Sequence, residues 1–381
     1  MKIALLNLVI DNNYGGNLQR YALCRILQKE GHEVEFVKRF AVQYYPRFPK
    51  NIIKYVFRFA RKLFVDRNNV VFQERLREWD NMLQISQTLS FINKNVPCYN
   101  KEFYPKDSLK ELNNAGFDAI VVGSDQVFRA PYNRCQENFF LGFVTNPLIR
   151  KIAYGASFGN AGDEYTTDLI KKCGQDIKQF HGVSLREKSG IDVFKTFGWE
   201  TKKNPRLVLD PTLLLEACEY ESLIENNDDN NGVFCYILDM TEEKQSFIDE
   251  IAQKLRKPYK IIDGLFPNLQ RGTFKHPILL PTIGQWLSYI KNADFVITDS
   301  YHGTIFSILF NKPFCSIVNS NRGRERFSYL EEEFGLSGLF IYELPVKFDI
   351  ESPFRIDWKN VNDKISVIKS ESISFLKESL C

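Results

Sequence analysis

The feature that most constrains this chain is a series of ten short apolar runs, rich in β-branched residues, that alternate with longer periodic stretches. Within each run the apolar residues are nearly continuous, which is typical of parallel strands covered by helices on both faces. The sequence therefore predicts an α/β protein. The predicted strands are Lys2–Ile10, His32–Val37, Phe117–Val122, Lys151–Ala156, Gly182–Leu185, Arg206–Leu209, Gly232–Leu238, Tyr259–Ile262, Phe295–Ile297 and Phe314–Ile317.

A polar break at Glu225–Gly232 divides these strands into two sets. Since 381 residues also favour two domains over one, we predict two doubly wound domains facing a cleft, with a boundary near 205–230. Residues 1–217 would form the first Rossmann-like domain and 218–350 the second. Residues 351–381 would form a helical tail, because Trp358–Leu380 has apolar residues at helical spacing.

Composition excludes several classes of protein. A net charge of +3 is too small for a dedicated nucleic-acid binder. No apolar run approaches the roughly 20 residues of a membrane-spanning helix, and the start of the chain lacks the pattern of a signal peptide, so we expect a cytoplasmic protein. The eight cysteines and four histidines show no metal-ligand spacing, so neither a metal nor a cofactor is predicted.

A basic segment at about 44–75 differs from both domains. The stretch from Arg47 to Arg75 contains eight Lys or Arg residues and only two acids. On a helix, its cations and its apolar residues would fall on different faces. One interpretation is a peripheral membrane contact through about 47–67, at the inner face of the membrane. The interpretation we favour at this stage is a helical insertion whose apolar face packs on its own domain.

Two polar loops follow strands of the first domain. Asp11–Asn17 precedes a helix expected to begin near Leu18, and its Asn13, Gly15, Gly16 and Asn17 would bind a ligand through close backbone approach. An ordinary capped turn is an equally good interpretation, and a dinucleotide fingerprint is poorly supported. After Ala119–Val122, Asp125 could orient a hydroxyl and Arg129 an anion, although helix capping explains this segment as well.

Two further loops carry charged or titratable groups. Arg186 and Lys188 follow a strand two residues apart and suit a ligand with a carboxylate and a phosphate, although a solvated turn would look the same. The segment Thr298–Thr304, which precedes a helix expected at Ile305–Phe310, has the highest density of functional residue types. Its His302, beside Gly303 near a helix N-terminus, could exchange protons near an anion.

Together these motifs resemble the polysaccharide pyruvyl transferase family, in family order over about residues 2–335. The resemblance implies two Rossmann-like domains arranged as in B-type glycosyltransferases. It also implies an enzyme that transfers a pyruvyl group from phosphoenolpyruvate to two hydroxyls of a sugar, forming a cyclic ketal. The similar elements are Asn13–Gln19, Gly123–Val127, Ser184–Lys188, Leu209–Thr212 and Asp299–Gly303.

The resemblance also suggests roles for residues. His302 is the implied catalytic residue and Arg186 the implied donor ligand; we add Asp299 as a second catalytic candidate. The remaining candidates for donor binding are Lys188, Ser300, Tyr301, Gly303, Thr304, Arg322 and Arg324. The candidates for acceptor binding are Asn13, Gly15, Gly16, Asn17, Asp125 and Arg129. The implied partners are phosphoenolpyruvate and a saccharide of a surface polysaccharide, lipid-linked or not, with galactose the commonest family acceptor.

One position departs from the family pattern. Some members have an arginine two residues before the histidine, where this chain has Ser300. Arg322, Arg324 or Arg326 could supply the missing cation. Two alternatives remain open: a B-type glycosyltransferase using a nucleotide sugar, although Asp299–Thr304 has no glutamate to hold the ribose, and a non-catalytic saccharide-binding relative.

Overall fold

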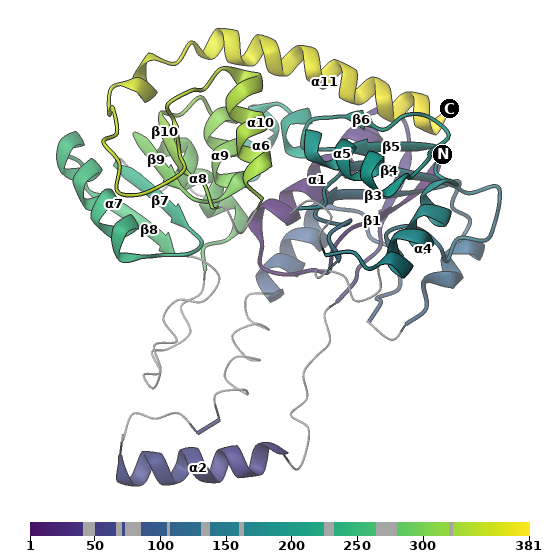
Figure 1. Cartoon of the computed structure of the whole chain (residues 1–381), viewed down its shortest axis with the longest axis horizontal. Coiled ribbons are helices and arrows are strands. Elements are labelled where there is room, and N and C mark those ends of the chain that lie inside the picture. The colour runs from purple at the N-terminus through teal and green to yellow at the C-terminus, as the bar shows by residue number, and fades with distance from the viewer. Residues whose placement is uncertain are drawn as a thin grey trace.

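The computed structural model describes residues 1–40, 50–65, 71–72, 85–104, 107–130, 138–159, 164–224, 232–263, 280–319 and 323–381. They contain two parallel β-sheets flanked by helices (Figure 1), as the sequence predicted. The predicted break at Glu225–Gly232 lies, except for Gly232, outside the described residues.

The first sheet has six strands in the order β2-β1-β3-β4-β5-β6. All pairings are parallel, so the carboxyl ends of its strands lie along one edge. Helices cover both faces, and the strand interiors are almost wholly buried. The strands are β1 (Lys2–Leu6), β2 (Glu33–Phe36), β3 (Ala119–Asp125), β4 (Arg150–Ala156), β5 (Gly182–Leu185) and β6 (Arg206–Leu207).

The second sheet has five parallel strands in the order β11-β10-β9-β7-β8. The apolar runs of the sequence predict four of these five strands. The strand that the sequence pattern misses is the two-residue β11, which is too short to show a pattern. The strands are β7 (Val233–Ile237), β8 (Tyr259–Asp263), β9 (Phe295–Thr298), β10 (Phe314–Ile317) and β11 (Phe340–Ile341).

Most helices connect consecutive parallel strands. They are α1 (Tyr14–Lys29), α2 (Lys50–Phe64), α4 (Thr167–Ile177), α5 (Lys188–Phe197), α6 (Ala217–Glu221), α7 (Glu242–Leu255), α8 (Ile283–Asn292), α9 (Tyr301–Leu309), α10 (Arg324–Phe334) and α11 (Trp358–Leu380). Short 3-10 turns lie at Leu109–Asn114, Pro211–Leu214 and Ser352–Arg355. No described helix is long and apolar enough to cross a membrane.

Two helices begin earlier than the sequence predicts. Helix α1 begins at Tyr14 rather than near Leu18, because the Asn13 side chain accepts a hydrogen bond from the Gly16 amide and caps it. Helix α9 begins at Tyr301 rather than Ile305, because Ser300 caps it in the same way. Residues predicted as loops therefore form first helical turns, which fixes their backbone.

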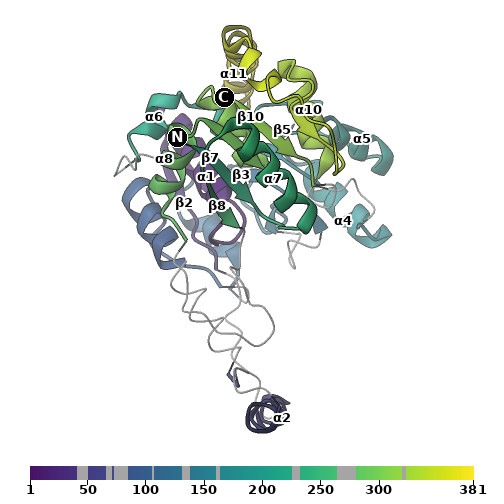
Figure 2. The same cartoon turned by 90° about the vertical axis from the view of Figure 1, so that its left-hand side faces the viewer.

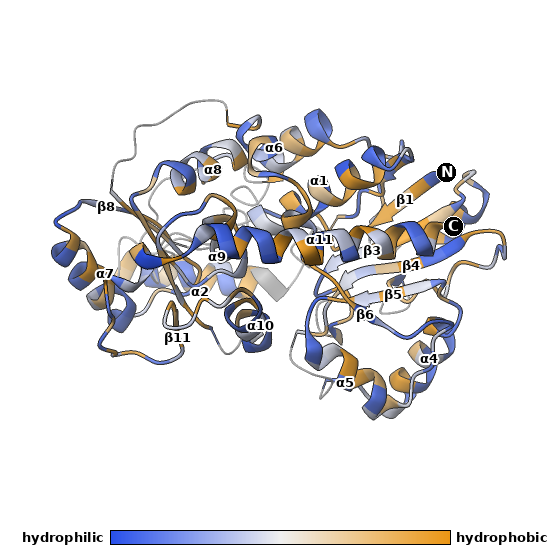
Figure 3. Cartoon of the chain, turned by 90° about the horizontal axis from the view of Figure 1, so that it is seen from above, coloured by the Kyte–Doolittle hydropathy of each residue, from blue (hydrophilic) through white to orange (hydrophobic). Residues whose placement is uncertain are grey.

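A continuous apolar core joins the two sheets. The Tyr14 ring stacks on Trp286 with centroids 5.2 Å apart, and the Tyr14 hydroxyl donates to the Pro281 carbonyl oxygen at 2.6 Å. Helix α11 crosses from one sheet to the other over this junction (Figure 3). Its Ser372 hydroxyl accepts a hydrogen bond from the amide of Leu209, which follows β6 of the first sheet. The core thus holds the carboxyl ends of the two sheets toward each other.

Helix α2 lies apart from both sheets (Figures 1 and 2). Its apolar side chains are exposed: Ile53 is 76%, Phe57 70% and Phe64 84% accessible to solvent. The interpretation that this face packs on its own domain is therefore wrong. The residues that flank α2, 41–49 and 66–70, lie outside the described residues.

Candidate active site

The candidate site lies where the carboxyl ends of the two sheets meet. Asp125 ends β3, Arg186 follows β5 and Asp210 comes after β6, while His302 follows β9 of the other sheet. Doubly wound sheets bind ligands at this end of their strands, because the loops there lead into helix N-termini. A pocket at this place has about 670 Å³ of atom-free space, part of it open to solvent.

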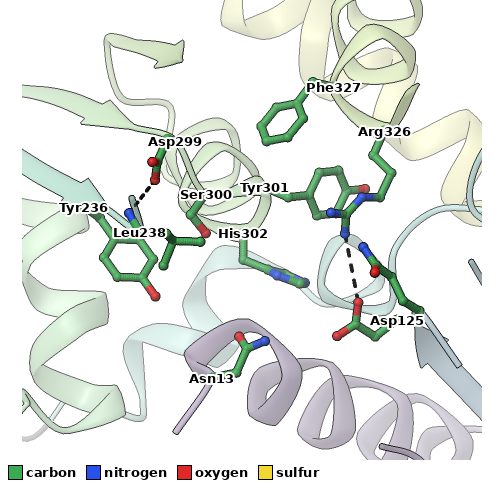
Figure 4. Close-up of a pocket in the computed structure, with 11 residues that line it drawn as sticks. Asn13, Asp125, Tyr236, Leu238, Asp299, Ser300, Tyr301, His302, Arg326 and Phe327 are labelled. Carbon is green, nitrogen blue, oxygen red and sulfur yellow. Dashed lines mark hydrogen bonds and ion pairs between the residues drawn. The ribbon is translucent and has the colours of Figure 1, made fainter. Parts of the chain in front are cut away.

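Both halves of the molecule line this pocket (Figure 4). The first contributes only polar side chains, and the second contributes a mixture of aromatic, apolar and charged ones. The lining residues are Asn13, Asp125, Gln126, Tyr236, Leu238, Asp299, Ser300, Tyr301, His302, Arg326 and Phe327. Their mixture of cations, carboxylates and rings suits a small anionic ligand together with a hydroxylated one.

Helices α1 and α9 approach each other so closely that only glycine fits between them. A Cβ atom built on Gly15 would lie 2.0 Å from Nδ1 of His302. A Cβ on Gly16, the next residue, would meet nothing closer than Asn13 at 3.6 Å. Glycine at position 15 therefore makes room for the imidazole, and the ligand-binding role of Gly15 stays a prediction.

Asp210 is the buried centre of a charged network. Its Oδ2 atom accepts hydrogen bonds from Gln19 at 2.6 Å and from Arg186 at 2.7 Å, and lies 3.6 Å from Nε2 of His302. Its Oδ1 atom accepts from the amide and hydroxyl of Thr212. The carboxylate thus holds a histidine of one sheet and an arginine of the other in fixed positions.

The two carboxylates of this network stay ionised. Burial alone would raise the pKa of Asp210, but His302, Arg186 and the Thr212 hydrogen bonds hold that pKa well below its ordinary value. Burial likewise opposes ionisation of Asp125, and Arg186, Arg326 and His302 lower the pKa of its carboxyl. Neither carboxyl therefore carries a proton to donate at neutral pH.

The Tyr301 ring contacts two arginines. The guanidinium carbons of Arg186 and Arg326 each lie 4.9 Å from its centroid. Arg186 is 1% exposed and bonded to Asp210 and Asp125, so it lies behind the pocket wall. Arg326 lines the pocket, with its NH1 atom 3.9 Å from Oδ1 of Asp125 (Figure 4).

The other arginines considered as replacements for the cation missing at Ser300 lie elsewhere. Arg324 is exposed, with its guanidinium 4.6 Å from the ring centroid of Tyr342. Arg322 lies outside the described residues. Of the three candidates, the structure places Arg326 in the pocket.

Two predicted ligands are directed away from the pocket. The Lys188 side chain is 62% exposed and lies 3.7 Å from a carboxylate oxygen of Glu332. Arg129 pairs with Glu164 at 2.9 Å, outside the pocket lining. Both side chains therefore pair with carboxylates and do not line the pocket.

The Asp299 carboxylate contacts two backbone amides and a lysine. Its carboxylate accepts hydrogen bonds from the amides of Leu238 and Asp239 and pairs with Lys244 at 2.7 Å. It lines the pocket (Figure 4), but these contacts tie the end of β7 to the start of α9. They indicate a positioning role for this carboxylate.

The remaining predicted residues of α9 form its first turn. Ser300 accepts from the Gly303 amide, and the Thr304 hydroxyl contacts the Ser300 carbonyl oxygen and, at 2.8 Å, the Ser316 hydroxyl. A Cβ on Gly303 would lie 2.3 Å from the Thr298 hydroxyl, so glycine lets α9 pack on β9. Gly303 and Thr304 thus hold the helix in place, and Ser300 and Tyr301 reach the pocket.

In the first loop, Asn13 lines the pocket and Asn17 does not. The Asn17 amide donates to the carbonyl oxygens of Asp11 and Asn13, which stiffens the loop, and its Oδ1 atom accepts from buried Arg20. Asn17 and Gly16 therefore shape the site from behind.

Sequence reasoning gave no role to Asp210, Glu187 or Tyr236. Asp210 had a detectable signal, because a carboxylate directly after a strand stands at the ligand-binding edge. Glu187 is buried behind Arg186, and burial raises the pKa of its carboxyl, although Arg186 and the Ser157 hydroxyl act in the opposite direction.

Among the described residues, no cluster of three or more His, Cys, Asp or Glu could hold a metal ion.

Comparisons with known proteins agree with this architecture. The family model for polysaccharide pyruvyl transferase matches residues 13–321. A search of curated proteins finds no match. A Listeria monocytogenes structure assigned as a UDP-N-acetylglucosamine 2-epimerase is similar with a TM-score of 0.50 and 10% identity, covering 96% of this chain and 90% of that one.

A second similar structure is Anabaena Alr3699/HepE in complex with UDP and glucose, with a TM-score of 0.46 and 10% identity, covering 100% of this chain and 97% of that one. At such identities a likeness concerns the fold alone. The fold is the two-domain arrangement of B-type glycosyltransferases and related epimerases.

Proposed function

The chain belongs to the polysaccharide pyruvyl transferase family, and from that premise we propose that it forms a cyclic pyruvate ketal on a sugar, with phosphoenolpyruvate as donor. The observation that carries the proposal is the placement of His302 at the pocket wall, held by Asp210 and close to Arg326 and Asp125. This arrangement offers a proton-exchanging group, a cation and a carboxylate around one small cavity.

The proposed reaction consumes two sugar hydroxyls and releases one phosphate. Two sugar hydroxyls form C–O bonds to the substituted carbon of phosphoenolpyruvate, and the bond from that carbon to the phosphate oxygen breaks. One hydroxyl proton, directly or through solvent, ends on the methylene carbon, which becomes a methyl group. The other ends on the departing phosphate. The enzyme must therefore deliver a proton to carbon and stabilise positive charge at its neighbour.

We propose His302 as the acid and base in this reaction. Asp125 and Asp210 have lowered pKa values, so neither can supply the proton at neutral pH. Asp210 lies against Nε2 of His302, so we propose that Nδ1, which lies beside Gly15, exchanges the proton with substrate. General acid–base catalysis of this kind contributes about 10²- to 10⁴-fold in rate.

We propose Arg326 as the donor-binding cation that faces the ligand, with Arg186 supporting it from behind Tyr301. A guanidinium suits both the carboxylate and the phosphate of phosphoenolpyruvate. This assigns Arg326 the place of the arginine that some family members carry at the position of Ser300. Asp125, ionised beside the pocket, would accept a hydrogen bond from the sugar and stabilise the cationic carbon.

The acceptor we propose is a saccharide of a surface polysaccharide under assembly in the cytoplasm, carried on a lipid at the inner face of the membrane. Galactose is the first sugar to test, because it is the commonest acceptor in the family. The direct test is phosphate release from phosphoenolpyruvate across galactosides and N-acetylhexosaminides. We expect release that depends on the acceptor and falls by about 10²-fold or more in His302→Ala.

Two results would contradict this function. One is unchanged turnover in His302→Ala, which would remove the proposed acid and base. The other is tight binding of a nucleotide sugar with no response to phosphoenolpyruvate, either in phosphate release or in melting temperature. The second result would favour the B-type glycosyltransferase.

A further inference from the structure

Helix α2 separates cations and apolar side chains into two faces. It contains five cations, namely Lys50, Lys54, Arg58, Arg61 and Lys62, and no acid. At roughly 100° per residue, Lys54, Arg58, Arg61 and Lys62 fall within an arc of about 100°. The opposite arc of about 160° contains Ile52, Ile53, Val56, Phe57, Phe59, Ala60, Leu63 and Phe64. Up to Phe64, no cation falls in the apolar arc and none of these apolar residues falls in the cationic arc.

The apolar arc is uncovered by the described part of the chain. Its large apolar side chains are between 42% (Ile52) and 84% (Phe64) exposed. Outside this arc, the rings of Tyr55 and Phe72 contact each other with centroids 5.1 Å apart. Arg58, on the cationic face, donates a hydrogen bond to the Val71 carbonyl oxygen. A stripe of this size in water needs a partner that accepts aromatic and aliphatic groups.

We propose that α2 lies in the interface of an anionic membrane, with Phe57 and Phe64 among the acyl chains and its cations among acidic headgroups. The charge pattern selects this partner. A helix with an acid-free, Lys- and Arg-rich face opposite a Phe-, Ile- and Leu-rich one matches both layers of such an interface at once. The inference stands independently of the pyruvyl transfer reaction, which uses other residues.

The experiment is sedimentation of the full chain with vesicles of phosphatidylcholine alone and of phosphatidylcholine with phosphatidylglycerol. We expect binding to the anionic vesicles about tenfold tighter or more, weakening as salt is raised. Phe57→Ser with Phe64→Ser should lower that binding about tenfold or more. Val367→Ser, which alters a side chain 61% exposed on α11, should leave it unchanged.

A second variant tests the charges. Reversal of Lys54, Arg61 and Lys62 to Glu should abolish the preference for anionic vesicles. Reversal of Lys178, Lys195 and Lys254, exposed cations of other helices, is the matched control. All these variants should keep wild-type turnover of phosphoenolpyruvate with a water-soluble acceptor, which separates this test from that of the proposed function.

Three outcomes would overturn the inference. The first is equal binding of wild type to both kinds of vesicle, or to neither. The second is wild-type vesicle binding by Phe57→Ser with Phe64→Ser. The third is a wild-type dimer in light scattering that the same pair of substitutions converts to a monomer, without vesicle binding, since α2 would then pair with a second copy of this chain.

Discussion

Asp210 and Glu187 are both buried carboxyl groups at strand ends, 1% exposed, yet their surroundings move their pKa values in opposite directions. Burial favours the neutral form of each. At Asp210 the hydrogen bonds and cations outweigh burial and lower the pKa, whereas at Glu187 burial outweighs Arg186 and the pKa is raised. The same network therefore depends on one ionised carboxylate far more than on the other.

This contrast predicts different costs for two matched substitutions. Asp210→Asn should lower the free energy of unfolding by about 3 kcal/mol at pH 7, because it takes from buried Arg186 the carboxylate it contacts at 2.7 Å and leaves Asp125 at 3.3 Å. Glu187→Gln should lower it by less than about 1 kcal/mol, since it also removes the penalty of a buried charge. Urea denaturation of both variants measures the difference, and equal costs would contradict the network as described.

The pH dependence has a definite sign. A carboxyl whose pKa is depressed by folding contributes stability above its unfolded pKa of about 3.9 and loses it as pH falls toward the folded pKa. The deficit of Asp210→Asn relative to wild type should therefore stay constant from about pH 8 to 5 and shrink below about pH 4. A deficit that shrinks above pH 7 instead would have to come from another group.

Gly15 and Gly16 form a matched pair for catalysis. Gly15→Ala should lower kcat about 10²-fold, because its Cβ would displace the His302 imidazole from the space it occupies. Gly16→Ala should change kcat less than about threefold, since its Cβ has room. Steady-state kinetics of the two variants decide the point; similar losses in both would indicate a general effect on α1.

Arg326 and Arg324 form a second pair. Arg326→Ala should raise the KM for phosphoenolpyruvate on the order of 30-fold, because a cation facing the ligand is removed from a largely buried position. Arg324→Ala, two residues earlier and exposed against Tyr342, should leave KM near the wild-type value. The opposite order of effects would move the donor site out of this pocket.

At the scale of elements, the apolar runs predicted ten of the eleven strands in the described part of the chain, because a strand buried on both faces has a nearly continuous apolar sequence. The starts of α1 and α9 were placed four residues late. Asn13 and Ser300 cap these helices, but each precedes polar and glycine residues that are equally typical of a loop. Capping depends on a single side-chain hydrogen bond, which a composition pattern does not show.

The packing of helix α11 on the rest of the molecule can be tested with two substitutions. Leu376 is fully buried and Val367 is 61% exposed on the same helix. Leu376→Ala should lower the free energy of unfolding by about 3 kcal/mol, because it opens a cavity where α11 packs on the rest of the molecule, whereas Val367→Ala should change it by less than about 0.5 kcal/mol. Chemical denaturation of the pair tests whether α11 is a structural part of the core.

At the scale of the whole molecule, the site exists because two sheets meet. His302 comes from one half and Asp210 from the other, and so do Arg326 and Asp125. Sequence reasoning found His302, Asp125 and Asn13, since each stands at a strand end, where ligands bind. It could not find that Arg326 faces the pocket while Arg186 lies behind Tyr301, because that depends on how distant segments pack.

Transfer of the pyruvyl group to a sugar can be observed by mass spectrometry of the acceptor. Purified protein is incubated with uniformly ¹³C-labelled phosphoenolpyruvate and a galactoside or N-acetylhexosaminide acceptor, with His302→Ala as control. We predict an acceptor that gains all the labelled carbons of the pyruvyl group, with one phosphate released per ketal and almost none in the variant. Phosphate release with no labelled acceptor, or equal labelling by His302→Ala, would contradict the account.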